Sequence, residues 1–151
     1  MRLSKREVLD FNEIVDMMNR CQVAHIGYVT EDVPYIVPVS FGYKVENESI
    51  TLYFHGAKEG MKYECFQKNP YVSIEFDHFM GNMKVGFGYT ARYESIMAKG
   101  KIIECVDKEK EEAMIYIMRH CGYPDFSGCE HLDRTGLFKI ELENISAKRR
   151  L

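Results

Sequence analysis

The chain has 151 residues, a net charge of −3 with histidine neutral, and 46% hydrophobic against 28% charged residues. This length suits a single domain, residues 1–151, that can build a hydrophobic core without disulfides or a structural metal. The slightly negative charge gives no electrostatic case for a nucleic-acid partner, and no apolar window approaches the ~18 residues of a membrane span. The five cysteines include no Cys-x-x-Cys pair, and no signal-like segment is visible, so we expect a cytoplasmic protein without a membrane partner.

The first predicted element is an amphipathic helix from about Lys5 to Asn19. Ser4 and Glu7 have the spacing of a capping box, in which the serine caps the helix start and the glutamate reaches back to it. Apolar residues then recur at helical spacing, which predicts one buried face. These residues are Val8, Phe11, Val15 and Met18.

Two strands are predicted next, at residues 21–29 and 34–43. The first is apolar apart from His25, which we interpret as a hydrogen-bonded histidine of the core. The second places large apolar side chains on one face, whereas Ile36, Pro38, Ser40 and Gly42 form a face that shrinks along the strand. Small side chains would let a flat ligand lie against the backbone, although an irregular edge strand gives the same pattern. Because proline cannot donate a ladder hydrogen bond, we expect an edge or a bulge at Pro38.

The segment Tyr53–Lys62 has the pattern of an anion site. An apolar strand breaks at Gly56 and Gly60, and Lys62 follows at the start of a predicted helix, residues 61–68. A helix start presents free backbone N–H groups and the positive end of the helix dipole, so it suits a phosphate. The alternative is an ordinary turn with a solvated lysine. The glycine spacing does not match a nucleotide P-loop, so we expect a cofactor phosphate held without a metal ion.

Alternation within residues 50–55 puts His55 on the face of Thr51 and Tyr53, away from the core face. We therefore expect His55 to be accessible to a ligand. A further strand is predicted at residues 72–76, whereas residues 77–88, rich in Gly, Met and Phe, have no clear assignment. A long strand pair is expected from about residue 87 to residue 103, and a last strand at 137–142 precedes a polar tail. Asp107 should cap a third helix, whose methionine stripe indicates core or dimer packing. Consecutive strands without a Rossmann glycine pattern favour an antiparallel β-barrel or sandwich with peripheral helices.

One cluster of residues resembles a metal site by residue type. It comprises His120, Cys121, Cys129 and His131. No pair in it has the usual zinc-ligand spacing, so we predict no metal site.

Several of these segments resemble the pyridoxamine 5′-phosphate oxidase-like split-barrel flavoproteins, and most closely their branch associated with 5-nitroimidazole resistance. The similarity runs from about residue 9 to residue 149, and its most specific part is the stretch from His55 to Lys62 with Asn69–Pro70 after it. The matching segments are Tyr35–Phe41, Tyr53–Lys62, Asn69–Ser73, Tyr93–Ile96 and Ile145–Arg149.

The resemblance implies a mainly β fold, a six-stranded antiparallel split barrel with peripheral helices that forms a homodimer and binds FMN between its subunits. Lys62 would hold the phosphate, Tyr93 and Ser95 would come from the partner subunit, and His55 is the candidate catalytic proton donor or acceptor. The implied cofactor-binding residues are Val37, Pro38, Val39, Ser40, Tyr53, His55, Ala57, Gly60, Met61, Lys62, Tyr93 and Ser95.

The expected function is that of an FMN-dependent oxidoreductase that reduces a small compound such as a nitroimidazole or nitroaromatic, with NAD(P)H as a possible donor. A non-catalytic flavin carrier or sensor is the alternative, and a redox- or zinc-sensing protein that uses the loop at 121–131 is a third. The strand at 34–40 lacks the arginine with which the oxidase holds its phosphate, and the tail lacks the oxidase's substrate-binding segment. Oxidation of pyridoxamine phosphate is therefore not expected.

Overall fold

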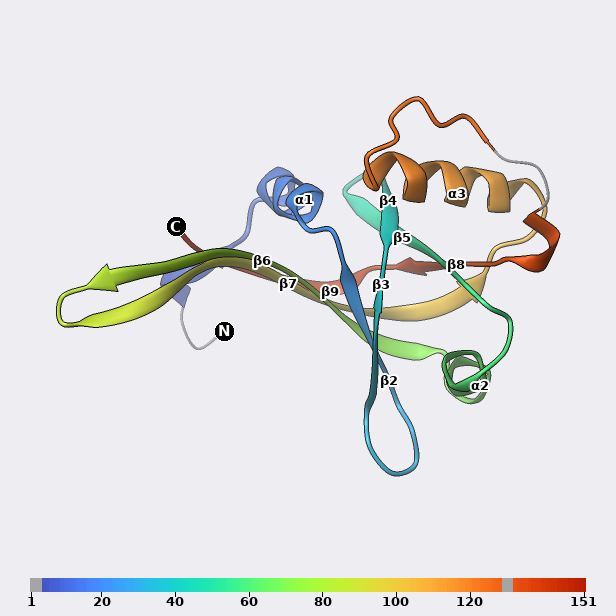
Figure 1. Ribbon diagram of the computed structural model, residues 1–151, viewed down its shortest axis with the longest axis horizontal. Coiled ribbons are helices and arrows are strands. Elements are labelled where there is room, and N and C mark those ends of the chain that lie inside the picture. The colour runs from blue at the N-terminus through green and yellow to red at the C-terminus, as the bar shows by residue number, and fades with distance from the viewer. Residues whose placement is uncertain (1–3, 129–131) are drawn as a thin grey trace.

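The computed structural model describes residues 4–128 and 132–151. They form one antiparallel sheet with three α-helices around it (Figure 1). The helices are α1 (Phe11–Arg20), α2 (Met61–Lys68) and α3 (Lys108–His120), with short 3-10 turns at Ser4–Arg6 and Leu132–Arg134. The strands are β1 (Glu7–Val8), β2 (Ala24–Tyr28), β3 (Tyr35–Val39), β4 (Phe41–Glu46), β5 (Ser49–Gly56), β6 (Tyr71–Val85), β7 (Gly88–Glu104), β8 (Gly136–Glu141) and β9 (Glu143–Arg150).

The sheet closes into a barrel because its two end strands belong to one chain segment. The strand order is β3-β2-β6-β7-β8-β5-β4. Strand β3 pairs with β2 and β4 pairs with β5, yet only Ser40 separates β3 from β4. Pro38 lies on the outermost strand β3, where one side needs no ladder bond. The predicted antiparallel barrel and the edge position of Pro38 are thus confirmed.

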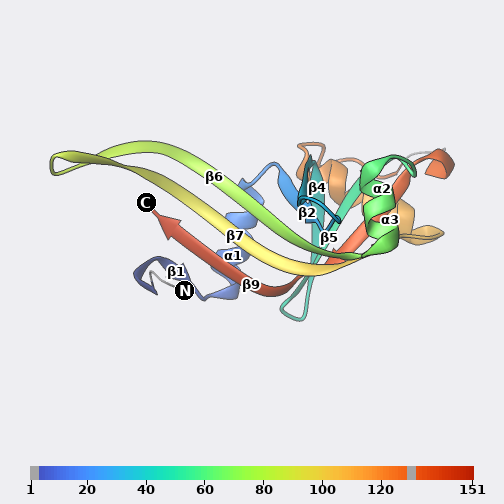
Figure 2. The same ribbon diagram turned by 90° about the horizontal axis from the view of Figure 1, so that it is seen from below.

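The described residues form nine strands, so the implied count of six is too low. The segment predicted as a polar tail is β9, which pairs with β7 and with β1. The segment 77–88, which had no clear assignment, completes the long hairpin of β6 and β7 (Figure 2). A periodicity analysis missed β9 because residues 143–150 are mostly polar, and it missed the outer part of the hairpin because residues 77–88 contain several glycines and do not alternate between apolar and polar side chains.

Helix α1 begins at Phe11, and the predicted start at Lys5 is wrong. Asp10 caps the helix, with its Oδ1 accepting a hydrogen bond of 2.9 Å from the Glu13 N–H. Residues 4–6 instead form a 3-10 turn, and Val8 pairs with Ala147 of β9. A long-range strand pairing therefore outweighs the local capping pattern at Ser4 and Glu7.

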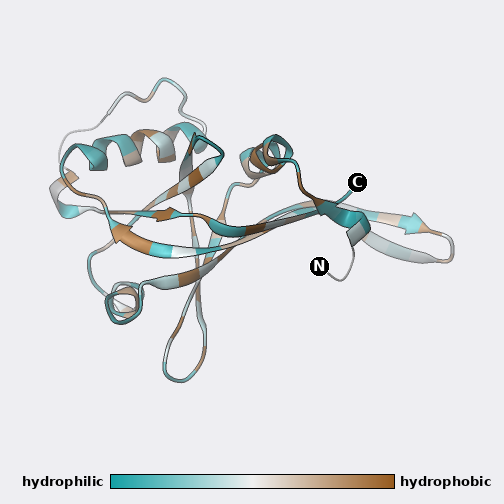
Figure 3. Ribbon diagram, turned by 180° about the vertical axis from the view of Figure 1, so that it is seen from behind, coloured by the Kyte–Doolittle hydropathy of each residue, from teal (hydrophilic) through white to brown (hydrophobic). Residues whose placement is uncertain are grey.

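The core fills the inside of the barrel and the spaces under α1 and α3. Met17 and Met18 of α1 are fully buried, and apolar residues alternate with polar ones along the strands (Figure 3). Helix α3 packs through Ala113 and Ile117 onto the far side of β4 and β5. The close approach depends on Gly42, where a Cβ atom would lie 2.2 Å from the backbone of Tyr116. Gly42 thus makes room for a helix, and not for a flat ligand as the sequence suggested.

One face of the sheet, which we call the open face, has no buried residue. It is made of the residues of β2, β3, β6 and β7 that alternate with the core residues. Its members are His25, Gly27, Ile36, Pro38, Tyr71, Ser73, Glu75, Asp77, Ser95, Met97, Lys99 and Lys101.

Within the described residues, no helix is long and apolar enough to cross a membrane.

Candidate functional site

The turn from β5 to α2 has the geometry of an anion site. Helix α2 has the predicted bounds, and its N-cap Gly60 has a φ of 84°, a left-handed conformation that favours glycine. No side chain caps this helix, and its first turn is closed by the Glu64 N–H, 3.0 Å from the carbonyl oxygen of Gly60. The N–H groups of Met61–Tyr63 precede that bond and are free to bind an anion.

Lys62 is half-buried beside this helix start. Its Nζ lies 5.9 Å from the centre of the Phe54 ring. A Cβ atom added to Gly56 would lie 2.3 Å from the same Nζ. Burial lowers the pKa of Lys62, because the ammonium group loses solvation. No carboxylate lies within ion-pair distance of Lys62 in residues 4–128 and 132–151. The side chain of Asp133 lies outside the described ones and is not included here. A partly buried cation without a counter-ion among the described side chains is costly, so this arrangement favours an external anion.

Tyr28 lines the same narrow pocket as Phe54, Ala57 and Lys62. Its hydroxyl group is buried and has no hydrogen-bond partner among the described residues. Burial also raises the pKa of Tyr28. Sequence analysis missed this residue, because a tyrosine in an apolar strand carries no local signal of a site. The buried Tyr28 hydroxyl is thus an unsatisfied polar group in the same packed pocket as Lys62.

The predicted accessibility of His55 is confirmed, because its side chain is exposed at the end of β5, opposite Leu137. Ala57, Gly60 and Met61 are also exposed around the same turn. These residues therefore belong to the same β5–α2 turn as Lys62, and Ala57 lines one narrow pocket with it.

The expectation that Tyr53 lies away from the core is wrong. Its side chain is only 4% exposed and stacks on Tyr116 of α3, with ring centres 5.5 Å apart. Alternation did place Tyr53 and His55 on one face, but α3 covers that face near Tyr53. Tyr53 is thus part of the core in the single chain.

The candidate residues on β3 divide between two faces. Val37 and Val39 point to the core side, whereas Pro38 and Ser40 are exposed. The large face of this strand is therefore core, as predicted. Pro38 and Ser40 keep the small, accessible face that a flat ligand would need.

Tyr93 and Ser95 lie on β7 and are half-buried. They pair with Phe79 and Asp77 of β6, on the same side of the sheet as Pro38. The predicted cofactor residues thus form two groups in one chain, one at the β5–α2 turn and one on or beside the open face.

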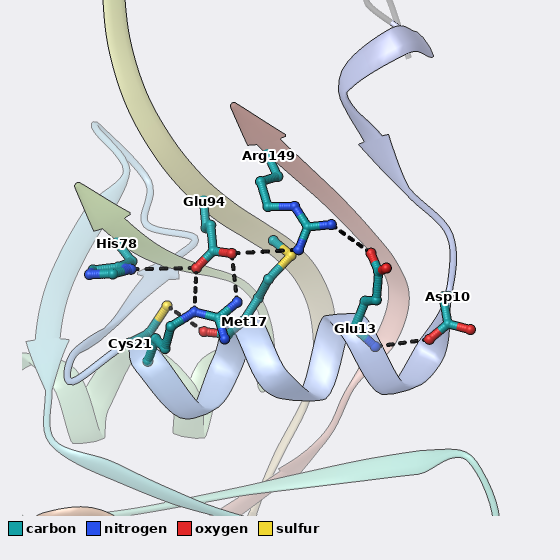
Figure 4. Close-up of polar contacts among 8 residues, drawn as sticks. Asp10, Glu13, Met17, Cys21, His78, Glu94 and Arg149 are labelled. Atoms are coloured by element: carbon teal, nitrogen blue, oxygen red, sulfur yellow. Dashed lines mark hydrogen bonds and ion pairs between the residues drawn. The ribbon is translucent and has the colours of Figure 1, made fainter. Parts of the chain in front are cut away.

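Glu94, between Tyr93 and Ser95, points the opposite way and is only 2% exposed (Figure 4). Arg20 of α1 donates two hydrogen bonds to it, from Nε to Oε2 at 2.7 Å and from Nη2 to Oε1 at 2.6 Å. Hydrogen bonds from Arg20, and more weakly from His78, hold the pKa of Glu94 below its ordinary value. This network connects α1 to the part of β7 that carries Tyr93 and Ser95.

The sequence suggested that His25 is a core residue, but the structure places it on the open face. Its Nδ1 is 3.1 Å from Oε2 of Glu75 and 4.0 Å from Oδ1 of Asp77. Burial and the nearby Asp77 raise the pKa of Glu75. The alternation pattern was correct, but this face is not covered by another layer of the fold.

His120 contacts the backbone of Cys21 and the ring of Phe41. Its Nε2 donates a hydrogen bond of 2.8 Å to the carbonyl oxygen of Cys21, and its ring packs 4.4 Å from that of Phe41, measured between centres. Cys121 is exposed, while Cys129 and His131 lie outside the described residues.

A family model described as pyridoxamine 5′-phosphate oxidase matches residues 10–149. The chain belongs to this family. A search of curated proteins found no match to the sequence.

Solved structures show the same fold. A candidate 5-nitroimidazole antibiotic resistance protein from Bacteroides thetaiotaomicron is 30% identical, with a TM-score of 0.82 over 94% of this chain and 85% of its own. An FAD- and heme-binding protein from Mycobacterium smegmatis is 16% identical, with a TM-score of 0.80 over 95% of this chain and 73% of its own. An FAD-binding protein from Mesorhizobium loti is 21% identical, with a TM-score of 0.66 over 95% of this chain and 96% of its own.

Proposed function

We propose that this protein binds FMN and reduces a small oxidised compound, such as a nitroimidazole or nitroaromatic. The observation that carries the proposal is the half-buried, unpaired Lys62 beside the uncapped start of α2. One ammonium group and one helix start match the single phosphate of FMN. The family match and the flavin-binding names of structural relatives support a flavin at this place in the fold.

The second part of the proposal is a homodimer that completes the flavin site. Pro38 and Ser95 lie on the open face, next to exposed apolar residues such as Ile36 and Met97. An uncovered sheet face with large apolar side chains favours a protein partner. In a symmetric dimer formed through this face, each flavin would contact the β5–α2 turn of one subunit and Tyr93 and Ser95 of the partner subunit.

In this proposal the bound flavin supplies the electron-transfer chemistry, and the protein binds, orients and protonates. Lys62 and the first N–H groups of α2 hold the phosphate. Pro38 and Ser40 offer a flat surface to the ring system. His55 is accessible at the end of β5 and would give a proton to the compound or accept one from it.

A non-catalytic flavin carrier is the second candidate. It is favoured by the absence, in the described part of the chain, of a hydrogen-bond partner that would orient His55. Burial raises the pKa of Cys21 and of Cys105 to about 12 and keeps both thiols protonated, so neither favours a thiol-based redox sensor. The sensor expected at the loop 121–131 would have to use the exposed Cys121, because Cys129 and His131 lie outside the described residues.

Steady-state turnover distinguishes a reductase from a carrier. Flavin-loaded protein is mixed with NADH or NADPH and a nitroimidazole, and loss of the nitro compound is followed by absorbance. We expect turnover that falls at least tenfold in His55→Ala with flavin content unchanged, while the control Glu111→Ala, at an exposed position of α3, retains full activity. Flavin-loaded wild-type protein without turnover with any donor would contradict the reductase and support the carrier.

A further inference from the structure

The β6–β7 hairpin extends past the strands with which it pairs in the sheet. Its outer part, residues 79–92, projects from the body of the molecule, and we call it the arm (Figures 1 and 2). The pairing of β9 with β7 ends at Arg150 opposite Tyr93, and that of β2 with β6 ends at Ala24 opposite Phe76. In residues 4–128 and 132–151, the arm strands therefore pair only with each other. A two-stranded ribbon is at best marginally stable in water unless another surface covers it.

The arm carries large apolar side chains where a solvated hairpin would carry polar ones. Phe87 at its tip is fully exposed, Tyr89 is 78% exposed, and Phe79 and Val85 are exposed as well. Its charged residues are Lys84 and Arg92, and it contains no acidic residue. The arm is thus an apolar, basic surface without a partner in the described chain.

The β2–β3 loop, residues 29–34, has the complementary properties. Val29 and Val33 are exposed, and Glu31 and Asp32 are acidic and exposed between them. Two hollows flank this loop, with volumes of about 560 Å³ and 450 Å³. Asp32 lines both hollows, while Lys99 and Glu143 line the larger one and Lys68 and Glu64 the smaller one.

We infer that the arm of one copy docks on the β2–β3 loop of a second copy. The inference rests on the proposed homodimer and adds the surfaces that hold it together. A two-fold axis makes the contact reciprocal, so two arms and two loops are covered at once. The arm extends roughly 20 Å from Phe79 to Val85 at ~3.4 Å per residue, which is long enough to cross a neighbouring subunit.

Charge and continuity favour a second copy over other partners. The arm is basic and the loop acidic, so the chain supplies both halves of an electrostatically matched contact. The open face connects them, because β6 and β7 carry the arm while β2 and β3 carry the loop. Together these surfaces form one continuous region, as a dimer of ordinary size with about 800 Å² buried per subunit requires. An apolar, basic arm could also enter an anionic membrane, which the test below distinguishes.

The test measures the dimer dissociation constant by analytical ultracentrifugation for wild-type protein and charge-reversal variants. We expect Lys84→Glu and Asp32→Lys each to weaken the dimer several-fold, and the double variant K84E/D32K to restore it towards the wild-type value. Phe87→Ser with Tyr89→Ser should weaken it at least tenfold. Lys108→Glu and Val45→Ser, which change exposed residues of α3 and β4, are the matched controls and should have no effect.

Any other result of the ultracentrifugation measurements overturns the inference. A wild-type dimer that tolerates both the arm and the loop variants would place the dimer contact elsewhere and leave the proposed flavin site standing. A wild-type monomer at all concentrations, with arm-dependent binding to phosphatidylserine vesicles, would assign the arm to a membrane. Flavin absorbance recorded on the same samples tests the proposed function separately, since an arm-dependent dimer that takes up no FMN would support this contact and contradict that function.

Discussion

The ammonium group of Lys62 occupies the space that a side chain at position 56 would need. A Cβ atom on Gly56 would come within 2.3 Å of Lys62 Nζ. Because Gly56, the last residue of β5, has no side chain, the side chain of Lys62 from the first turn of α2 can pack against the strand at this point. Because Nζ is the end of a flexible chain, it can move away from a larger residue at little cost in stability.

Gly56→Ala should therefore impair anion binding while leaving the fold intact. We expect its urea midpoint to stay close to wild type and its FMN affinity to fall, because the ammonium group is displaced from the helix start. Lys62→Ala sets the scale, with an expected loss of roughly 1.5–3 kcal/mol, or about 10- to 150-fold in dissociation constant. Fluorescence titration of FMN measures both. Wild-type affinity in either variant would contradict the assignment of Lys62.

The pH dependence of FMN binding should identify Lys62 as the cation. Burial lowers the pKa of Lys62 from 10.5, so the free protein loses this charge at a lower pH than an ordinary lysine would. FMN affinity should fall as the pH rises through that lowered pKa. Lys62→Arg keeps its charge throughout this range and should show a flatter profile. Identical profiles for the two proteins, titrated between pH 7 and 10.5, would contradict this role.

Local sequence signals predicted α2 correctly but failed where distant segments decide. Gly60 directly precedes α2 and Asn69–Pro70 directly follow it, so both ends of this helix could be predicted from adjacent residues. The start of α1 depends on pairing between Val8 and Ala147, which no local pattern reveals. Tyr53 is covered by a helix that begins more than fifty residues later in the chain.

The candidate site was predicted in a similarly uneven way. The turn around Lys62 and the accessible His55 followed from glycine positions and strand alternation. The orphaned hydroxyl of Tyr28 did not, because its position in the pocket depends on how β2 packs against α2. The buried network at Glu94 joins residues from separate elements and likewise has no local signature.

Gly42 should be a strict requirement for docking of α3. A Cβ atom there would lie 2.2–2.3 Å from backbone atoms of Tyr116 and Ile117, which cannot move without moving the helix. We expect Gly42→Ala to lower the free energy of unfolding by about 2 kcal/mol or more. Gly27→Ala is the control, because its Cβ would lie 3.6 Å from the Ser73 oxygen, an ordinary contact. Equal urea unfolding curves for the two variants would contradict the tight approach of α3.

Glu94 should stabilise the fold at neutral pH and lose this effect in acid. Its folded-state pKa is held below 4.5 by Arg20, so its contribution is complete above its unfolded pKa and disappears as the pH falls through the folded one. Glu94→Gln should cost roughly 1–2 kcal/mol at pH 7, a figure discounted because Arg20 is 42% exposed. Urea unfolding at pH 7 and pH 3 measures the difference, which should shrink in acid. A constant difference would contradict the ionic contribution, and Glu13→Gln, in an exposed pair with Arg149, is the control.

The most direct test of the central claim is the absorption spectrum of protein purified without added cofactor, followed by denaturation and identification of any released chromophore. We predict flavin bands, release of FMN, and close to one flavin per chain after FMN is added. Protein with Lys62→Ala should lose most of its flavin during the same purification. A colourless wild-type protein that also fails to take up added FMN would contradict the flavin site at the β5–α2 turn.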